Sequence, residues 1–406
     1  MAHSIETLIV GAGQAGLSLS YYLTQQGREH LIIDRALQPA EAWRNQRWDS
    51  FTLNTPNELT RLPGADYQGS DPDGFLSRVE LIRFFEDYLQ RFNLPVRFGI
   101  EATSLTPNDH HYTVTTTAET FNARNVVIAT GLYQSPKVPP FAANLSASIH
   151  QVHSSEYRSP DRLPSGAVLV VGSGQSGCQI AEELYQLGRK VYLSVGRAGR
   201  VPRRYRGKDM IVWLNETGFF DRTADQLPSS QARFSANPQL SGSKGGHTIN
   251  LHQFVRDGVT LVGHIGDVQV GKLRFAPDLR QNLLNADEIE ATMLHNIDNY
   301  IRAHGLDAPP DNVPVLRDAY DQKEIAELDV RQADITSIIW AGGYSFSFDW
   351  VKLPLFDADG FPIQQRGATA YPGLYFLGLP WLHTQKSGLI FGVGDDAAYI
   401  ASRIQG

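Results

Sequence analysis

The chain has 406 residues, more than one ordinary domain contains, so its length predicts two domains with sizeable cores. Hydrophobic residues make up 42% and charged residues 19%, which excludes a disordered, collagen-like or disulfide-scaffold protein. The formal net charge is −7, so no general positive field attracts nucleic acid or an anionic membrane surface. The one cysteine, Cys178, excludes an internal disulfide, a Cys-x-x-Cys redox pair and a multi-thiolate metal site.

The sequence also shapes our expectation of where the protein acts. Its first residues carry no basic stretch followed by an apolar run, and no segment approaches the ~20 apolar residues of a spanning helix. We therefore expect a soluble, cytoplasmic protein that binds neither membranes nor nucleic acid. The histidines do not stand at metal-ligand spacing from carboxylates or thiols, so we also expect no metal site.

A strand, a glycine turn, a helix and a second strand follow one another twice along the chain. The first copy is an apolar run at 7–10, an amphipathic stretch at 14–26 and a second apolar run at 31–34. The second copy has the same order about 160 residues later, at 168–171, 175–187 and 191–194. This order is typical of nucleotide-binding units, so the sequence predicts two of them.

The first glycine turn reads Gly-Ala-Gly-Gln-Ala-Gly between a strand and a helix. In this context the first glycine makes the turn, the second lets a pyrophosphate approach the backbone, and the third allows close helix packing. Asp34 ends the next strand, where its carboxylate is placed to accept hydrogen bonds from ribose hydroxyls. The candidate residues are Gly11, Gly13, Gln14, Ala15, Gly16, Asp34 and Arg35. The alternative is a tight strand-to-helix turn that holds no ligand.

The second turn repeats the pattern, but no carboxylate ends its following strand. An acid there would repel a 2′-phosphate, whereas Ser194 and Arg197 would bind one, and a charge-assisted hydrogen bond contributes ~1.5–3 kcal/mol. This favours NADPH over NADH. The candidate residues are Gly172, Gly174, Gln175, Ser176, Gly177, Ser194 and Arg197. The alternative is that Arg197 and the nearby arginines, Arg200, Arg203 and Arg204, form a solvated basic loop.

Two dinucleotide sites in one chain indicate electron transfer between a nicotinamide donor and a tightly held flavin. The turn-rich stretches at 136–141 and 159–166 mark a crossing into the second domain, and strand-like segments at 335–340 and 374–377 complete the first. We therefore predict an α/β protein of two Rossmann-like dinucleotide-binding domains. The FAD domain spans 1–158 and 325–406, and the NADPH domain at 159–324 is inserted in it.

Four further segments carry more specific patterns. They are Ala129-Thr130-Gly131, Trp340-Ala341-Gly342-Gly343-Tyr344, His153-Ser154-Ser155-Glu156-Tyr157, and the run Ser-Phe-Thr-Leu-Asn-Thr-Pro-Asn-Glu at 50–58. Together with the two glycine turns they resemble the flavin-containing monooxygenase family over nearly the whole chain. The resemblance places Asn54 beside the flavin, with Trp43, Thr130 and Gly131 at the FAD. The alternative for Asn54 is a turn-capping residue before Pro56.

The C-terminal part fits the same resemblance. Gly378-Leu379 lacks the Gly-Asp pair of disulfide reductases, and 388–396 is a glycine-punctuated loop that enters a helix. The N-terminus of that helix would face the pyrimidine edge of the flavin, where reduction leaves negative charge. We therefore add Gly378, Gly388 and Leu389 to the predicted FAD site.

The resemblance implies a reaction in which NADPH reduces FAD and the reduced flavin forms a hydroperoxide with O2. Its terminal oxygen then passes to a small-molecule nucleophile, most favourably an amine nitrogen or a sulfide sulfur. The alternatives are an NAD(P)H-dependent flavin reductase or oxidase, Baeyer–Villiger oxygenation of a ketone, and a non-catalytic flavin sensor. The expected partners are the substrate and O2, and the sequence leaves a homodimer open.

Overall fold

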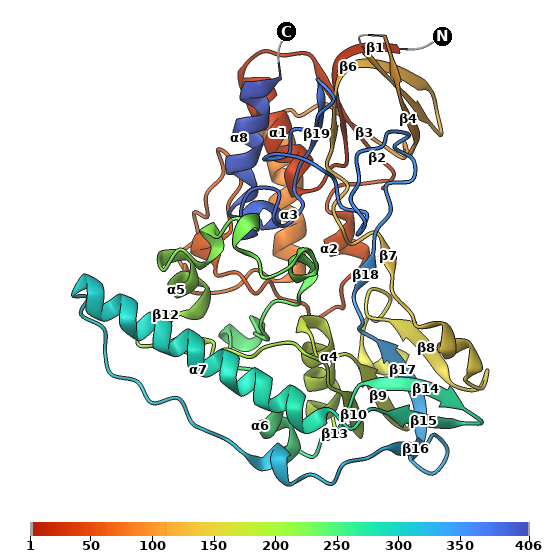
Figure 1. The fold of residues 1–406 in the computed structure, drawn as a ribbon, viewed down its shortest axis with the longest axis vertical. Helices are drawn as coiled ribbons and strands as arrows, with labels where there is room; N and C mark the ends of the chain where they lie inside the picture. Colours follow the sequence, from red (N-terminus) through yellow and green to blue (C-terminus); the bar gives the residue numbers. More distant parts are fainter. Residues whose placement is uncertain (1–2, 110, 405–406) are drawn as a thin grey trace.

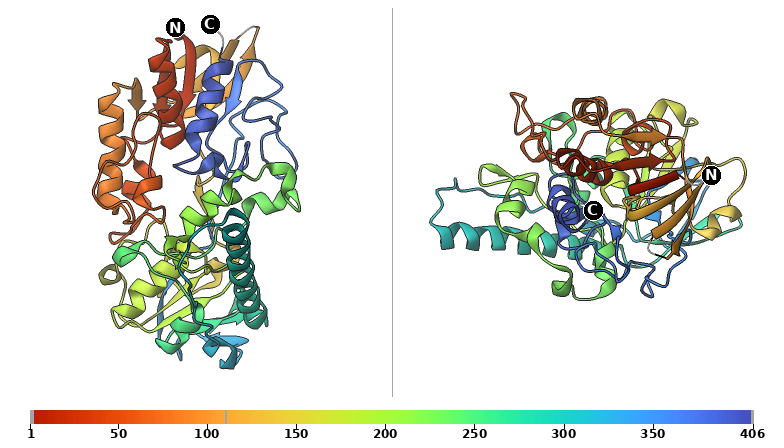
Figure 2. Two further views of the ribbon diagram at one scale, coloured as in Figure 1. Left: turned by 90° about the vertical axis from the view of Figure 1, so that its left-hand side faces the viewer. Right: turned by 90° about the horizontal axis from the view of Figure 1, so that it is seen from above.

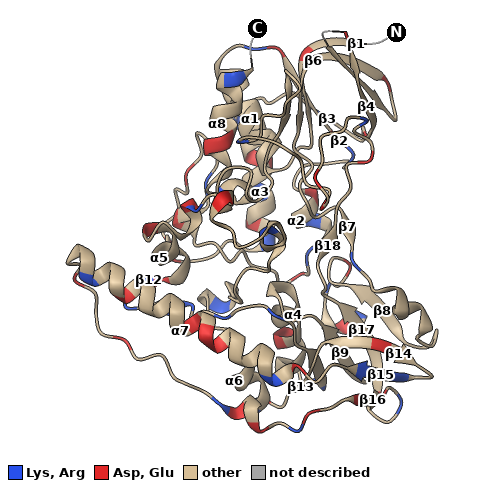
Figure 3. Cartoon of the chain, in the orientation of Figure 1, with Lys and Arg blue, Asp and Glu red and all other residues tan. Residues whose placement is uncertain are grey.

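The structure is a computed structural model that describes residues 3–109 and 111–404. Two α/β units are stacked along the long axis, and the chain begins and ends in the same unit (Figure 1). Figure 2 shows the units as two lobes. Figure 3 shows basic and acidic residues interspersed over both, in keeping with the small negative net charge.

The first unit is built on a seven-stranded sheet in the order β3-β2-β1-β6-β5-β4, with β19 also paired to β6. Its strands are β1 (His3–Val10), β2 (His30–Asp34), β3 (Val96–Phe98), β4 (Ala102–Asn108), β5 (His111–Thr116), β6 (Thr120–Ile128) and β19 (Leu374–Phe376). The strands β1, β2, β3, β6 and β19 run parallel, while β4 and β5 form an antiparallel flap. The parallel pairing brings the ends of β1, β2 and β6 to one edge.

The helices of this unit are α1 (Gln14–Gln25), α2 (Glu41–Asn45), α3 (Arg78–Arg91) and α8 (Val393–Arg403). Helices α1, α3 and α8 each bury an apolar face, whereas the short α2 has no buried residue and packs beside α3. The start of α3 is fixed by a capping box, in which Ser77 and Glu80 satisfy each other's backbone N–H groups. The helix predicted near the C-terminus is α8, which lies beside α1 (Figure 1).

The second unit has a five-stranded parallel sheet in the order β13-β10-β9-β17-β8. Its strands are β8 (His150–His153), β9 (Ala167–Val171), β10 (Val191–Ser194), β13 (Thr260–Val262) and β17 (Ile335–Trp340). Strands β9 and β10 are buried along their whole length, which explains their continuous apolar runs. The helices are α4 (Gln175–Gln186), α5 (Met210–Glu216), α6 (Leu251–Arg256) and α7 (Leu279–His304).

Smaller elements complete the chain. Strands β14 (Ile265–Gln269), β15 (Lys272–Phe275) and β16 (Glu327–Asp329) form an antiparallel sheet, and β11 (Arg204–Tyr205) pairs with β12 (Lys208–Asp209). Short 3-10 turns lie at Asn57–Leu59, Pro140–Asn144, Pro160–Arg162, Phe219–Asp221, Ala224–Gln226, Ser230–Phe234, Ser243–Gly245, Asp318–Asp321 and Gln385–Gly388. No helix among the described residues is long and apolar enough to cross a bilayer.

The strands of the second sheet reach beyond the residues 159–324 predicted for the second domain. Strand β8 lies before the boundary at 158 and β17 lies after the boundary at 324, yet both pair within the second sheet. The two crossings run side by side as the antiparallel pair β7 (Ser135–Pro136) and β18 (Tyr344–Ser345). An apolar strand does not reveal from its own sequence which of two parallel sheets it joins.

One segment of the second unit leaves its own sheet and contacts the first unit. We call residues 217–249 the bridging segment. It lies beside the C-terminal segment in Figure 2, where green meets blue. The Gln385 backbone N–H donates to the carbonyl of Arg222 (3.0 Å), and the Ser230 hydroxyl donates to Asp359 (2.8 Å). The two units are therefore joined by packed contacts as well as by the β7–β18 crossing.

Candidate functional site

The first glycine turn has the geometry that its sequence predicts. Gly11 has φ +115°, and a Cβ there would lie 2.5 Å from the carbonyl oxygen of Ala129. A Cβ on Gly16 would lie 1.9 Å from the Gly11 carbonyl oxygen. A Cβ on Gly13, in contrast, would meet no atom within 4 Å. Gly11 and Gly16 are therefore required by packing, and Gly13 leaves open space in which a pyrophosphate fits at the start of α1.

Asp34 lies against this turn. Its Oδ2 accepts from the Ala12 N–H (2.6 Å) and its Oδ1 accepts from the Ala36 N–H (2.8 Å). Each oxygen keeps a lone pair for a further donor, so the position suits a ribose hydroxyl. Arg35 is exposed and donates to the carbonyl of Gln134 (3.4 Å), which places it beside the chain that leaves β6.

The C-terminal segment closes over the same turn. Gln14 Nε2 donates to the carbonyl of Gly388 (2.7 Å). A Cβ on Gly378 would lie 2.4 Å from the Cβ of Ala15, so only glycine allows the chain to pass there. Leu389 follows Gly388 and is half-buried. The structure thus brings these C-terminal residues to the first turn, although they are far from it in sequence.

Of the remaining residues predicted at the first turn, Thr130 lies against it, with its backbone N 3.2 Å from where a Gly11 Cβ would be. Thr130 and Gly131 follow β6, and the Gly131 carbonyl accepts from Gln134 Nε2 (2.8 Å). Trp43 is half-buried on α2, with its ring 5.8 Å from that of Phe51. Their roles toward a cofactor stay predictions.

The second glycine turn repeats the first. Gly172 has φ +105°, and a Cβ there would lie 2.6 Å from the Ala341 carbonyl oxygen, while a Cβ on Gly177 would lie 1.8 Å from the Gly172 oxygen. A Cβ on Gly174 would meet no atom within 4 Å, as at Gly13. Ala341 follows β17 as Ala129 follows β6, so the two units use the same strand arrangement around the turn. Ser176 and Gln175 begin α4 directly after it.

The structure corrects the assignment of Ser194. Its side chain is buried, its hydroxyl donates to the Gly263 carbonyl (2.9 Å) and it accepts from the Ile265 N–H (3.2 Å). These bonds stabilise the loop after β13, so the hydroxyl is not free for a 2′-phosphate. Arg197 is exposed beyond the end of β10 and remains the candidate cation.

The alternative of a solvated basic loop is also wrong for two of the arginines. Arg200 is buried and pairs with Asp287 (2.7 Å) and with Glu290 of α7. Arg203 is 2% exposed and pairs with the fully buried Asp209. Buried pairs of this kind fix the loop to its neighbours, and breaking one leaves an uncompensated charge.

Asn54 connects the two units. Its Nδ2 donates to Gln175 Oε1 (2.9 Å), and its Oδ1 accepts from Gln179 Nε2 (2.8 Å) and from the Gly242 N–H (3.2 Å). All three partners belong to the second unit. The side chain therefore contacts the first turn of α4 and the bridging segment, and it does not cap the turn before Pro56.

Further contacts around α4 and Asn54 were not predicted, and those made by Ser50 and by Asn54 cross between the units. Glu183 of α4 accepts from the hydroxyls of Tyr157 (2.6 Å) and Ser50 (2.6 Å). Burial, and then the hydrogen bond to Glu183, raise the pKa of the Tyr157 phenol, which therefore stays neutral. Arg203 Nη1 donates to the Asn54 carbonyl (3.0 Å). Only the family motifs around Tyr157 and at 50–58 pointed to this region, because the partners on α4 have no sequence signal of their own.

Two further side chains have structural roles. Cys178 is fully buried, its thiol donates to the Ser173 carbonyl (3.2 Å), and burial raises its pKa, so it packs behind the second turn as a neutral group. His153 is buried between the Ser155 hydroxyl (2.8 Å) and the Gly343 carbonyl (3.0 Å). Among the described residues, no group of three His, Cys, Asp or Glu side chains is placed to hold a metal ion.

Comparison with known proteins decides which family uses this arrangement. Residues 8–216 match the sequence profile of the pyridine nucleotide-disulphide oxidoreductase family, and a relative at 34% identity spans the full chain. The chain belongs to this family. That relative, from Geobacillus kaustophilus (strain HTA426), is described as an uncharacterized oxidoreductase, and the alignment covers 100% of this chain and 99% of the relative.

A more distant relative and a solved structure carry functional descriptions. A probable indole-3-pyruvate monooxygenase of Arabidopsis thaliana is 25% identical over 98% of this chain and 86% of its own length. The solved flavin-containing monooxygenase of Stenotrophomonas maltophilia shares the fold, with a TM-score of 0.66, 19% identity, and coverage of 99% of this chain and 98% of that one. The predicted oxidoreductase and its resemblance to flavin-containing monooxygenases are thus confirmed, and FAD and NADPH are consistent with family membership.

Proposed function

We propose that this oxidoreductase is a flavin-dependent monooxygenase that transfers one oxygen atom of O2 to a small-molecule nucleophile. An amine nitrogen or a sulfide sulfur is the favoured acceptor. The observation that carries the proposal is the pair of equivalent glycine turns, open above Gly13 and Gly174, with Asn54 of the first unit bonded to Gln175 directly after the second turn.

FAD belongs at the first turn. The open space above Gly13, the free N–H groups of α1 and the carboxylate of Asp34 suit the pyrophosphate and ribose of a dinucleotide. The bond from Gln14 to the Gly388 carbonyl holds the C-terminal loop against the same turn, which helps exclude water. When bound, the flavin supplies the redox and oxygen chemistry, and the protein supplies orientation and shielding.

NADPH belongs at the second turn. Gly174 leaves the same open space at the start of α4 as Gly13 leaves at α1. Arg197 is the exposed cation beyond β10, where a 2′-phosphate would lie. The two units, each a Rossmann-like domain in this proposal, would then present their cofactors to each other across the contact made by Asn54.

Asn54 is the residue of this chain that we expect to act on the reacting groups. A side-chain amide nitrogen carries two N–H donors, and Gln175 uses one of them. The other is available to a bound cofactor, and a neutral amide donates a hydrogen bond without giving up its proton. Because Gln175 begins α4, the orientation of this amide depends on the second turn.

Disulfide reduction is the less favoured activity, although the family name includes it. The only cysteine of the chain, Cys178, is buried and neutral, so the protein offers no reactive thiol pair. Flavin reductase or oxidase activity and oxygenation of a ketone are the remaining alternatives. They differ from the proposal in the product and not in the cofactors.

The test is product analysis with purified, flavin-loaded protein, NADPH and O2. A tertiary amine, a dialkyl sulfide and a cyclic ketone serve as trial substrates, and each product is scored by a mass gain of one oxygen from ¹⁸O2. Hydrogen peroxide is measured in parallel. Label in the amine or sulfide supports the proposal. NADPH oxidation that yields only peroxide over a broad panel would establish an oxidase, and labelled ester from the ketone alone would establish the Baeyer–Villiger reaction.

A further inference from the structure

A cavity of about 830 Å³ lies in the second unit between α7 and residues 214–222. Its volume falls in the range of small-molecule sites, roughly 300–1,000 Å³. Among the described residues that line it, none belongs to either glycine turn, to the Asn54 contact or to the C-terminal loop. The cavity is therefore separate from the position proposed for FAD, and it shares only Arg197 with the position proposed for NADPH.

One side of the cavity is apolar. Ile289, Met293 and Ile297 follow one another at helical spacing on α7, and Leu214 and Phe219 face the same space. Such a surface suits an apolar or aromatic body of a ligand, because its burial there releases water from both partners.

The charged residues of the cavity are two cations and one anion: Arg197, Arg222 and Glu288. The neighbouring arginines Arg200 and Arg203 are neutralised by carboxylates. Within the described part of the chain, neither Arg197 nor Arg222 has a carboxylate within ion-pair distance. The cavity therefore carries one excess positive charge, which a monoanion would compensate.

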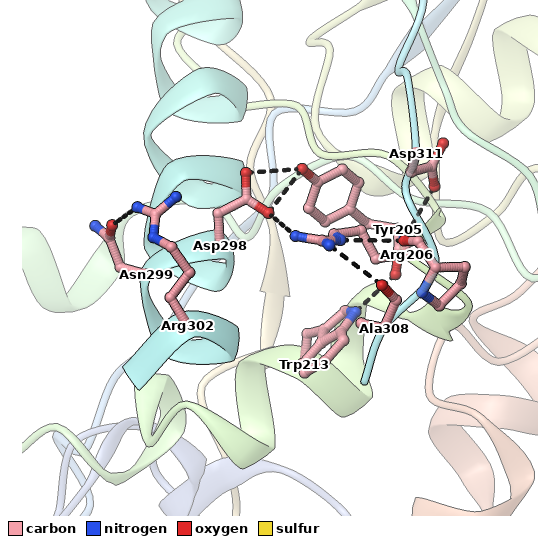
Figure 4. Close-up of polar contacts among 9 residues, drawn as sticks. Tyr205, Arg206, Trp213, Asp298, Asn299, Arg302, Ala308 and Asp311 are labelled. Atoms are coloured by element: carbon pink, nitrogen blue, oxygen red, sulfur yellow. Dashed lines mark hydrogen bonds and ion pairs between the residues drawn. The ribbon is translucent and has the colours of Figure 1, made fainter. Parts of the chain in front are cut away.

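Both walls are held in place by polar contacts. On α7, Asp298 accepts from Arg206 (2.8 Å) and from the hydroxyl of Tyr205 (3.1 Å), as Figure 4 shows. The Trp213 indole N–H donates to the Tyr205 carbonyl (2.7 Å) and so fixes α5, which leads into the opposite wall. Arg200 holds the N-terminal half of α7 through its ion pair with Asp287. A cavity between walls fixed at this many points is largely preformed, which lowers the cost of binding.

Arg222 is itself oriented by Gln385, which lies outside the cavity, and by Phe219, which lines it. Its Nη2 donates to Gln385 Oε1 (2.6 Å), its Nε donates to the Phe219 carbonyl (2.9 Å), and its guanidinium lies 3.8 Å from the centre of the Phe219 ring. Nη1 makes no hydrogen bond within the described residues, so the guanidinium keeps donors for a carboxylate next to an aromatic ring.

We propose that this cavity is a second small-molecule site, which binds an organic monoanion with an apolar body and pairs its carboxylate with Arg222. Arg197 is the second cation of the site, at its border with the NADPH position. The ligand class follows from the excess charge, the apolar wall and the volume. Because the site shares no residue with the first turn, binding there does not depend on whether the protein oxygenates its substrate.

Calorimetric titration of the full-length protein with 4-phenylbutyrate tests the charge requirement. 4-Phenylbutyramide, which has the same body and no charge, is the matched ligand. We expect the acid to bind at one site and the amide to bind at least 10-fold more weakly. Equal binding of acid and amide, or no binding of the acid at millimolar concentration, would overturn the proposal.

Three variants locate the site. Arg222→Gln should weaken binding of the acid at least 10-fold, and Arg197→Gln should weaken it about 3-fold or more. Arg204→Gln should weaken it less than 2-fold, because Arg204 is exposed and does not line the cavity. An unchanged affinity in the Arg222 variant overturns the assignment. Hydrogen exchange should slow in 214–222 and 285–300 when the acid binds, and protection confined to other segments would overturn it as well.

A titration at saturating NADP⁺ separates this site from the cofactor position. The acid should still bind, with its affinity reduced by a few-fold at most through Arg197. Complete displacement would show that the cavity is part of the nicotinamide dinucleotide site. All of these measurements read binding and not oxygenation, so the two proposals can fail independently.

Discussion

The side-chain amides of Asn54 and Gln175 are hydrogen-bonded across the two units, with Asn54 Nδ2 2.9 Å from Gln175 Oε1. Asn54 lies in the loop that precedes α3, and Gln175 is the first residue of α4. The family resemblance places Asn54 beside the flavin, and the start of α4 suits a nicotinamide dinucleotide. This hydrogen bond connects the two positions. A dinucleotide bound at the second turn would therefore affect the orientation of Asn54 through Gln175.

Replacing Asn54 should uncouple the reaction. Asn54→Ala removes the amide donors while Gln175 keeps its bond to the Pro238 carbonyl (2.6 Å), so the fold should persist. We expect NADPH oxidation to continue while oxygenated product per NADPH falls by about two to three orders of magnitude, the usual effect of losing one aligned donor. Product and peroxide yields measure this. Asn45→Ala, in an exposed position, is the control, and an equal yield in both variants would contradict the role of Asn54.

The two kinds of glycine in the first turn should respond oppositely to alanine. Gly13→Ala adds a methyl group into open space at φ −77°, so the protein should keep its stability and lose FAD. Gly16→Ala forces a contact of 1.9 Å with the Gly11 oxygen and should lower the free energy of unfolding by about 1–3 kcal/mol or more. Urea unfolding and the flavin absorbance of the purified variants distinguish the two effects. A Gly13 variant that retains full flavin would refute the pyrophosphate position.

Cofactor preference should depend on Arg197 and not on Ser194. Arg197→Gln removes a charge-assisted hydrogen bond of ~1.5–3 kcal/mol, so the kcat/KM ratio of NADPH to NADH should fall about 10- to 150-fold. Ser194→Ala should leave that ratio within 2-fold and lower stability, because the Ile265 N–H loses its acceptor. Steady-state kinetics with both nucleotides measures the ratios. A large shift in the Ser194 variant would restore the sequence-based assignment.

The bridging segment should make stability depend on pH through His247. Its imidazole bonds to Glu182 of α4 (2.7 Å), and this hydrogen bond raises the pKa of His247 above its ordinary value of about 6.5. Because the folded pKa is the higher one, the contribution is complete below pH ~6.5 and is lost as the pH rises through the folded pKa. We expect a loss of less than about 1 kcal/mol, since the ring is partly exposed.

Urea unfolding of wild type and His247→Gln between pH 5.5 and 9 measures the contribution of His247 to the free energy of unfolding. The difference in unfolding free energy between the two proteins should shrink toward high pH. A difference that is constant across the range would contradict the linkage to His247.

The buried pair of Arg203 and Asp209 should be the most sensitive ion pair in the second unit. Arg203→Met leaves the fully buried Asp209 carboxylate without its partner, which typically costs about 3–5 kcal/mol. It also removes the donor to the Asn54 carbonyl. Arg204→Met, at the exposed neighbouring position, should change stability by less than about 0.5 kcal/mol. Chemical denaturation of both variants is the measurement, and similar losses would contradict the pairing.

The sequence by itself determined what is local. The apolar runs that end at Gly11 and Gly172 and the helices that follow them carry both glycine turns, because turn, helix start and strand are encoded within about 25 residues. The insertion of the second unit and the return of Leu374–Phe376 to the first sheet were also predicted from order along the chain. Asp34 was correctly placed at its turn, because the end of a parallel strand fixes its neighbours.

Tertiary structure alone decided which distant segments meet. The strands β8 and β17 joined the second sheet because pairing partners are chosen by packing. The apolar sequence of β17 fits either sheet, and the short polar sequence of β8 carries no strand signal of its own. Ser194 turned inward because Gly263 and Ile265 offered its hydroxyl partners that no local pattern reveals. Arg200 pairs with carboxylates on α7, and Asn54 bonds to Gln175, through contacts between residues far apart in the chain. Arg203 pairs with Asp209 only six residues away, but the burial of this pair is set by the surrounding fold.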